Sequence, residues 1–184
     1  MRNVGSSIAF LALCSASLAL SSCSSLYSDL PSGSSSSATT SPDYSARLSS
    51  HITTREKVVL VDPHVHAWGA YDNEGNLVRS GLATAGSDWC PDLGRPCHTA
   101  VGSFRVNSLG SEDCKSKIFP MPRGGAPMPY CMFFNRGQAL HGVDDGEVVE
   151  GNISHGCVRL HVADAEWLRF NFVNVGTRVV VKSY

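Results

Sequence analysis

The residues most able to do chemistry are a cysteine and a histidine in the C-terminal third of the chain. Cys157 ends the segment SHGC at residues 154–157, and His141 lies 16 positions upstream. A cysteine nucleophile needs a base that removes the thiol proton, and N–H donors that stabilise the oxyanion formed when sulfur attacks a carbonyl. His141 can be the base if the chain returns to it after residues 142–153. The amides of Gly156 and Cys157 can be the donors.

An imidazolium beside a thiol lowers the pKa of that thiol. If His141 and Cys157 meet, we therefore expect them to exist largely as imidazolium and thiolate. Two other interpretations stay open. Cys157 can be a small buried apolar side chain, and His141 can be a histidine that only orients a loop.

The N-terminal segment has the pattern of an export signal. Arg2 precedes an apolar run at residues 8–20, which is too short to span a bilayer as a helix but fits the apolar region of a signal peptide. The run ends in LSSC at residues 20–23, which resembles the bacterial lipoprotein signal and predicts a lipid on Cys23. An ordinary secretory signal cut near the same place is the alternative. Both interpretations predict export.

Composition divides the chain into three parts. We expect a lipoprotein signal peptide at 1–22, a lipid-anchored serine-rich linker at 23–51 and a single catalytic domain at 52–184. The formal net charge is −1 and no basic stripe is present, so nucleic acid is not expected as a partner.

The cysteine count predicts a free thiol in the domain. The chain has seven cysteines, and setting aside Cys14 in the signal and Cys23 at its end leaves five, an odd number. Four cysteines allow three pairings. We favour the two that close short loops containing glycine or proline, although spacing alone does not fix connectivity: Cys90 with Cys97, and Cys114 with Cys131. Cys157 is then the unpaired cysteine.

The domain is predicted to be mostly β with one or two short helices. Strands are expected at 58–61, 67–71, 77–81, 102–106, 130–134, 138–141 and 177–182, and a helix is expected at 163–172. The glycine-, proline- and cysteine-rich region between residues 86 and 129 is too long to be an ordinary connection and is expected to be functional or stapled by disulfides.

These segments resemble the L,D-transpeptidase (YkuD) catalytic domain. The similarity is carried by HG at 141–142, SHGCVRL at 154–160, HTAVGSF at 98–104, MPYCMFF at 128–134, DAEWL at 164–168 and GTRVVV at 176–181. It extends over roughly residues 57–183. Ala100 stands where the family usually has proline, and the four loop cysteines are additional to the family pattern, which suggests a stapled subgroup.

The resemblance implies a β-sandwich and a cysteine-dependent acyl transfer on peptidoglycan stem peptides. In the family, the cysteine attacks the carbonyl of the third stem residue, commonly meso-diaminopimelate, and expels the terminal D-alanine. The thioacyl-enzyme then passes its acyl group to an amine, which gives a 3→3 cross-link or a protein attachment. Carried over to this sequence, Cys157 is the nucleophile, His141 is the base, and the carbonyl of Gly142 orients His141.

The resemblance also implies substrate-binding roles for four residues: Ser154, His155, Arg159 and Tyr130. Two of these assignments have structural alternatives, because His155 can act through packing alone and Arg159 can brace the loop by donating to backbone carbonyls. His64 and His66 could share one face of a strand, but no third ligand is evident nearby, so no metal is expected. No cofactor is expected either.

Two functional alternatives to acyl transfer onto an amine stay open at this point. With water as the acceptor the same site is an L,D-carboxypeptidase, and without chemistry the same groove belongs to a non-catalytic peptidoglycan-binding lipoprotein. The expected location is the cell envelope. In a cell with two membranes, the lipoprotein resemblance implies the outer membrane facing the periplasm, because Ser24 rather than aspartate follows the predicted lipidation site. In a cell with one membrane, it implies the outside of the plasma membrane. We expect a monomer whose partners are the donor tetrapeptide and an amine acceptor.

Overall fold

The computed structural model describes residues 43–184. The predicted signal peptide, the predicted lipidation site Cys23 and most of the predicted linker lie outside these residues. Within residues 43–184, none of the helices combines the length and the apolar character that crossing a bilayer requires.

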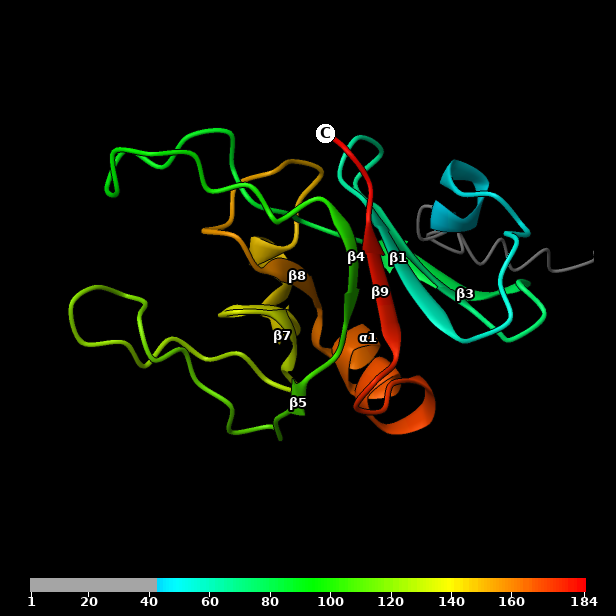
Figure 1. The fold of residues 1–184 in the computed structure, drawn as a ribbon. Coiled ribbons are helices and arrows are strands. Elements are labelled where there is room, and N and C mark those ends of the chain that lie inside the picture. The colour runs from blue at the N-terminus through cyan, green and yellow to red at the C-terminus, as the bar shows by residue number, and fades with distance from the viewer. Residues whose placement is uncertain (1–42) are drawn as a thin grey trace, which may run out of the picture. The chain divides into compact units, whose positions relative to one another are not determined.

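The strands of the described segment form two sheets (Figure 1). The larger sheet has the order β3-β2-β1-β9-β4, with β1 at Val58–Asp62, β2 at Ala67–Tyr71, β3 at Leu77–Leu82, β4 at Gly102–Arg105 and β9 at Arg178–Val181. The smaller sheet has the order β5-β6-β7-β8, with β5 at Ser108–Leu109, β6 at Met132–Asn135, β7 at Gln138–Val143 and β8 at Val158–His161. This arrangement confirms the predicted mostly β fold.

The helical segments are short. They are η1 (Tyr44–Arg47), η2 (Asp145–Glu147), α1 (Val162–Trp167) and η3 (Leu168–Phe172). The helix predicted at 163–172 is present, but it begins as α1 and ends as the π-helical turn η3, in which the Val173 amide donates to the Leu168 carbonyl at 2.7 Å.

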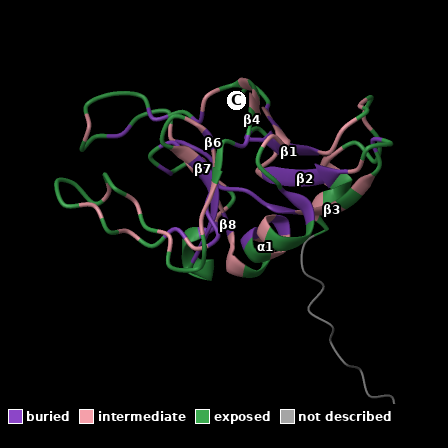
Figure 2. Cartoon of the chain, turned by 60° about the horizontal axis from the view of Figure 1, so that its bottom comes forward, coloured by how far each residue is buried: buried purple, intermediate pink, exposed green. Residues whose placement is uncertain are grey.

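Apolar side chains from both sheets form one core. Trp68 from β2, Met132 from β6 and Leu160 from β8 are fully buried in the same cluster. All five residues of β1 are buried, because neighbouring elements cover both faces of this strand. Figure 2 shows the buried positions concentrated in the sheets, whereas the long loops are mostly exposed.

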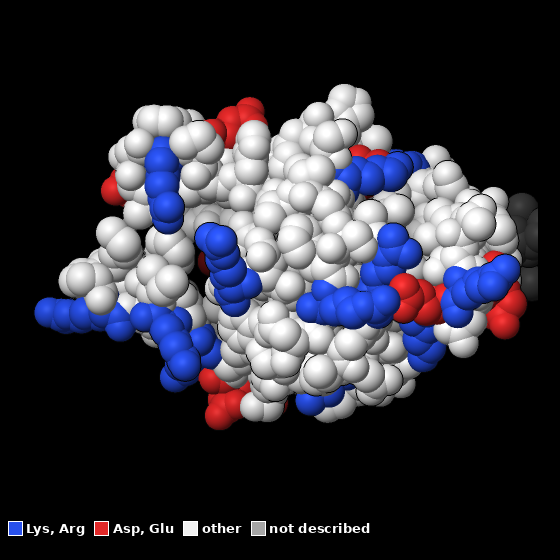
Figure 3. Space-filling model, viewed as in Figure 1, with Lys and Arg blue, Asp and Glu red and all other residues white. Residues whose placement is uncertain are grey.

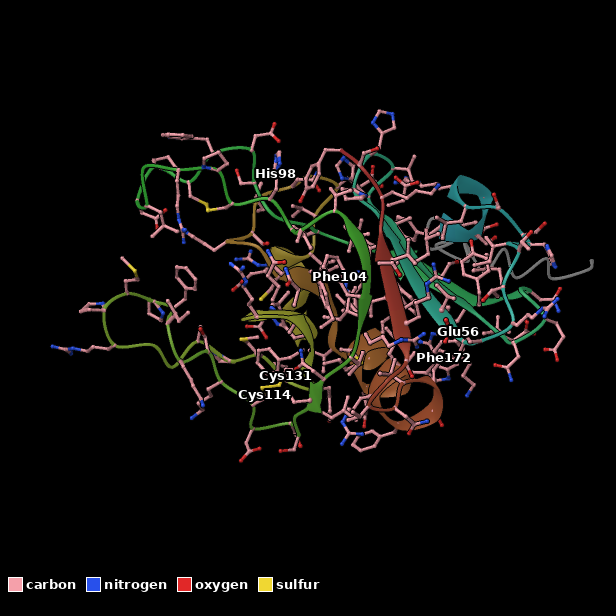
Figure 4. All side chains as sticks on the ribbon, in the orientation of Figure 1. Glu56, His98, Phe104, Cys114, Cys131 and Phe172 are labelled. Atoms are coloured by element: carbon pink, nitrogen blue, oxygen red, sulfur yellow. A yellow bond between two sulfur atoms is a disulfide. The ribbon has the colours of Figure 1, made fainter. Side chains whose placement is uncertain are left out.

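Two long loops leave the same side of the sandwich (Figure 1). The first stapled loop (83–101) connects β3 to β4, and the second stapled loop (110–131) connects β5 to β6. The disulfide Cys90–Cys97 closes the first loop on itself, and Cys114–Cys131 does the same for the second, which confirms the predicted pairing. Figure 4 shows Cys114 and Cys131 at the base of the second stapled loop.

The structured domain begins before residue 52, where the sequence placed its boundary. Leu48 and Ile52 pack against a second apolar cluster that contains Val58 and Tyr71. The Tyr71 hydroxyl donates to the Ser49 carbonyl at 2.8 Å. The last residues of the predicted linker are therefore part of the domain, because their apolar side chains cover the outer face of the larger sheet.

Candidate active site

His141 lies in the middle of β7 and is 5% exposed. Its Nδ1 atom is 2.9 Å from the carbonyl oxygen of Gly142. Because a carbonyl oxygen can only accept a hydrogen bond, Nδ1 must carry the proton, and Nε2 is left with its lone pair. The predicted contact between Gly142 and His141 is present, and it fixes the tautomer that can act as a base.

Cys157 precedes β8 and is the only free cysteine of the described residues. Its Sγ atom lies 3.7 Å from the Gly137 carbonyl, to which the thiol donates, and it accepts from the Ala139 amide. The side chain is half-buried and packs beside Met128 and Cys131. The start of β7 therefore holds the sulfur atom in place.

The parallel pairing of β7 with β8 brings the histidine and the cysteine together. His141 is the register partner of Arg159, and Leu140 is the partner of Val158. Cys157 lies two residues before Arg159, directly before the first residue of β8. His141 and Cys157 line one cleft with a volume of about 1140 Å³.

Burial favours the neutral forms of both groups. It lowers the pKa of His141 to about 4, against the opposing effect of the Gly142 hydrogen bond, and the positive charge of Arg159 lowers it further. Burial also raises the pKa of the Cys157 thiol, although the Ala139 hydrogen bond and Arg159 oppose this. Burial thus opposes the expected thiolate–imidazolium pair, because low-polarity surroundings penalise each charge.

The motif loop is braced by its own serine. Gly156 has φ +118°, a backbone conformation that favours glycine, and its amide donates to Ser154 Oγ at 3.1 Å. Ser154 Oγ donates in turn to the Cys157 carbonyl. Of the two amides expected to form the oxyanion hole, the Gly156 amide is thus engaged. The Cys157 amide has no acceptor among the backbone hydrogen bonds of residues 43–184.

His155 joins the two stapled loops. Its Nε2 atom lies 2.9 Å from Asp92 of the first stapled loop, and its ring packs at 4.6 Å, centroid to centroid, against Phe119 of the second. The side chain of His155 therefore contacts both stapled loops.

Arg159 lies in β8 beside His141 and lines the cleft. Its guanidinium is 3.5 Å from Glu147, and its backbone amide and carbonyl both bond to Thr84. The side chain is only 22% exposed, so its charge acts on the neighbouring groups with little screening by water.

Tyr130 does not lie where a groove residue was expected. It belongs to the main core cluster, its ring packs edge-on against Phe170 at 5.7 Å, and it is not among the residues that line the cleft. The aromatic ring is drawn into the core because burying its large apolar surface is favourable.

Two positioning residues were missed by the sequence analysis. Thr99 is fully buried, and its hydroxyl accepts from the Gly86 amide at 3.0 Å and donates to the Gly156 carbonyl at 2.9 Å. Gln138 accepts from the Ala100 amide and donates to the His98 carbonyl, both at 3.0 Å. Figure 4 shows His98 on the first stapled loop. The HTAVGSF segment signalled this region, but its hydrogen bonds depend on contacts distant in sequence.

Polar atoms of Cys90, Asp92 and His155 lie within 4.8 Å of one another. Cys90 is bonded to Cys97, so it offers no thiolate. Only a carboxylate and an imidazole remain as ligands, which is fewer than a structural zinc site uses. His64 and His66 lie in the turn between β1 and β2 rather than on one face of a strand.

Comparisons with known proteins agree with this geometry. The family model described as "L,D-transpeptidase catalytic domain" (YkuD) matches residues 56–181. No significant match was found among curated proteins. The solved structure of an L,D-transpeptidase from Xylanimonas cellulosilytica is 25% identical, with a TM-score of 0.62, over 74% of this chain and 66% of that chain.

Two mycobacterial structures share the fold. An L,D-transpeptidase from Mycobacterium smegmatis is 21% identical with a TM-score of 0.56, over 70% of this chain and 59% of that chain. L,D-transpeptidase 3 from Mycobacterium tuberculosis, solved with a faropenem-derived adduct, is 23% identical with a TM-score of 0.55, over 69% of this chain and 60% of that chain. This chain thus spans less than two thirds of the length of the solved relatives. The family match covers most of the sequence, and the chain belongs to the YkuD L,D-transpeptidase catalytic domain family.

Proposed function

We propose that this protein is an L,D-transpeptidase that transfers acyl groups between peptidoglycan stem peptides through a thioacyl-enzyme. One observation carries the proposal. His141 of β7, with Nδ1 held by the Gly142 carbonyl, and Cys157, an unpaired thiol directly before β8, line one cleft. A nucleophile, an oriented base and a groove for a peptide are the parts that acyl transfer requires.

The first half-reaction begins with both groups neutral. As the Cys157 sulfur attacks the carbonyl of the third stem residue, His141 Nε2 takes the thiol proton. The carbonyl oxygen becomes an oxyanion, and the Cys157 amide, which has no backbone acceptor of its own within residues 43–184, donates a hydrogen bond to it. When the tetrahedral intermediate collapses, the imidazolium gives its proton to the departing amine of the terminal D-alanine, and a thioester remains.

The second half-reaction reverses the proton movements. An acceptor amine attacks the thioester, His141 takes a proton from that amine and returns it to sulfur, and the new amide leaves. Arg159 stands beside both reacting groups, so its positive charge favours the forms of the site that carry negative charge, the thiolate and the oxyanion.

The test uses a purified disaccharide tetrapeptide and reads products by mass. The wild-type protein is expected to release one D-alanine from the donor tetrapeptide per turnover and to join two muropeptides into a cross-linked dimer. Cys157→Ser is expected to form neither product, and a carbapenem should add to the wild-type protein but not to this variant. Cross-linking by Cys157→Ser would overturn the proposal.

The same assay separates the two other functions. Tripeptide without any dimer would identify an L,D-carboxypeptidase, in which water replaces the acceptor amine. Sedimentation with peptidoglycan sacculi that is unaffected by Cys157→Ser, together with no acyl adduct in the mass spectrum of the wild type, would identify a non-catalytic binding protein.

We also propose that the protein acts in the cell envelope, as a monomer anchored by a lipid on Cys23. The support is the LSSC segment at residues 20–23 and the substrate class of the proposed reaction. Expressed in its native host, the full chain should incorporate a labelled fatty acid and fractionate with membranes, whereas Cys23→Ala should lose both properties. Fractionation of the wild type with soluble protein would contradict the anchor.

A further inference from the structure

The cleft carries an excess of positive charge that the proposed chemistry does not use. Among residues 43–184, Glu147 is the only carboxylate residue that lines the cleft, and it is paired with Arg159 at 3.5 Å. The remaining basic side chains of the lining form no ion pair and no side-chain hydrogen bond within residues 43–184. They are Arg95, Lys115, Lys117 and Arg136.

A disulfide or a tight turn holds the backbone of three of these residues. The carbonyl of Arg95 accepts from the amide of Cys90 at 2.9 Å, directly beside the first disulfide. Lys115 follows Cys114 and pairs with Pro127 across the second stapled loop. Arg136 has φ +50° in the turn between β6 and β7, immediately before the residue that contacts the Cys157 sulfur.

The four basic residues therefore line the cleft from three segments of the chain: the first stapled loop, the second stapled loop and the turn between β6 and β7. Figure 3 shows Lys and Arg side chains above and below the hollow at the left of the molecule. Like charges around a concave surface add their potentials and attract anions into it. All four side chains are exposed, so the attraction depends on ionic strength.

We propose that Arg95, Lys115, Lys117 and Arg136 form a carboxylate-binding subsite that selects stem peptides with free carboxylates and disfavours stems whose carboxylates are amidated. This inference rests on the proposed function. A stem whose third residue is meso-diaminopimelate carries, beyond the reacting carbonyl, a side-chain carboxylate, and its terminal D-alanine carries another. The planar guanidinium groups of Arg95 and Arg136 can each donate two parallel hydrogen bonds to a carboxylate. The ammonium groups of the two lysines add positive charge.

The test measures binding without turnover. In a Cys157→Ala background, the full chain is titrated calorimetrically with a synthetic stem tetrapeptide and with the same peptide amidated at the side-chain carboxylate of diaminopimelate. The free acid is expected to bind roughly ten times more tightly at low salt, and the ratio should shrink as salt is added. Equal affinity for the two peptides would overturn the proposal.

Matched variants then locate the subsite. Arg95→Gln, the double variant Lys115→Gln with Lys117→Gln, and Arg136→Gln should each reduce the preference for the free acid by about two- to five-fold, the range of exposed charge pairs. Arg123→Gln is the control, because Arg123 is an exposed residue of the same second stapled loop that does not line the cleft. An equal reduction in Arg123→Gln would show only a general charge effect and contradict the subsite.

The two proposals fail separately. A wild-type protein that forms no acyl adduct, while the Cys157→Ala variant still prefers the free acid, would remove the proposed reaction and leave the subsite. A wild-type protein that cross-links free-acid and amidated stems with the same kcat/KM would leave the reaction and remove the subsite.

Discussion

The β7–β8 pair and the two stapled loops line the same cleft but are held by different interactions. Five of the six residues of β7 are buried, and its position is set by strand pairing and by the core. The second stapled loop is mostly exposed, and a disulfide and local backbone hydrogen bonds hold it. His141 therefore belongs to the buried core, whereas most of the basic side chains of the proposed subsite stand on cross-linked surface loops.

The largest expected effect comes from removing the base in the rigid part. His141→Asn keeps an N–H that can reach the Gly142 carbonyl but lacks the lone pair of Nε2. The value of kcat is expected to fall by about 10²–10⁴-fold, the usual contribution of general base catalysis, with the substrate affinity of the loops nearly unchanged. Steady-state kinetics with a tetrapeptide donor checks this. A large rise in KM with kcat unchanged would contradict the division between the two regions.

Acid should lower the free energy of unfolding through the same residue, His141. The pKa of His141 is about 4 in the folded protein against an ordinary value of 6.5, so the unfolded chain binds the proton first. Stability is therefore fully present above about pH 6.5 and falls by about 3 kcal/mol as the pH drops toward 4. Denaturant unfolding at several pH values measures this loss, which His141→Asn should reduce. The acid limb of kcat/KM should lie near pH 4 for the wild type.

Breaking the staples should affect the loops before the sheets. Replacing Cys114 and Cys131 together with alanine opens a loop whose ends are 17 residues apart, and the chain-entropy relation gives a loss of about 3 kcal/mol. Replacing Cys90 and Cys97, 7 residues apart, should cost about 2.5 kcal/mol. Thermal unfolding measures both losses. At temperatures where the variants stay folded, KM should rise more than kcat falls, and the opposite pattern would show that the loops position the reacting groups.

A single hydroxyl connects the first stapled loop to the rigid part. Thr99→Val leaves the Gly86 amide and the Gly156 carbonyl without their buried partner, which is expected to cost about 1–3 kcal/mol of stability. Because Gly156 adjoins Cys157, kcat should fall as well. Thr99→Ser keeps the hydroxyl and is the control, and equal losses in the two variants would point to packing of the methyl group instead.

The smallest effect is expected at the contact between His155 and Asp92 of the first stapled loop. Asp92→Asn weakens the contact with His155, and because Asp92 is exposed the free energy of unfolding should change by less than about 1 kcal/mol. KM for the donor should rise a few-fold while kcat stays the same. A drop in kcat comparable to that of His141→Asn would mean that His155 takes part in the chemistry rather than in loop packing.

The sequence alone determined the parts of the molecule that depend on local pattern. Apolar and β-branched runs predicted β1, β2 and β3, and the 3–4 spacing of Ala165, Leu168 and Phe172 predicted the helical segment. Cysteine parity predicted the free thiol at Cys157, and short loops favoured the two disulfides that the structure contains. The strand β8 was not predicted, because its four residues follow a glycine-rich turn and are ordered by pairing with β7.

Only the tertiary structure decided which side chains meet, and in which protonation state. The pairing of β7 with β8 brings His141 and Cys157 to one cleft, and burial shifts the pKa of each group toward its neutral form, although their residue types alone suggested an ion pair. The same packing moved Tyr130 into the core and made Thr99 a link between loop and motif. Pairing partners, dielectric surroundings and hydrogen bonds between distant segments are properties of the folded chain, and no local pattern encodes them.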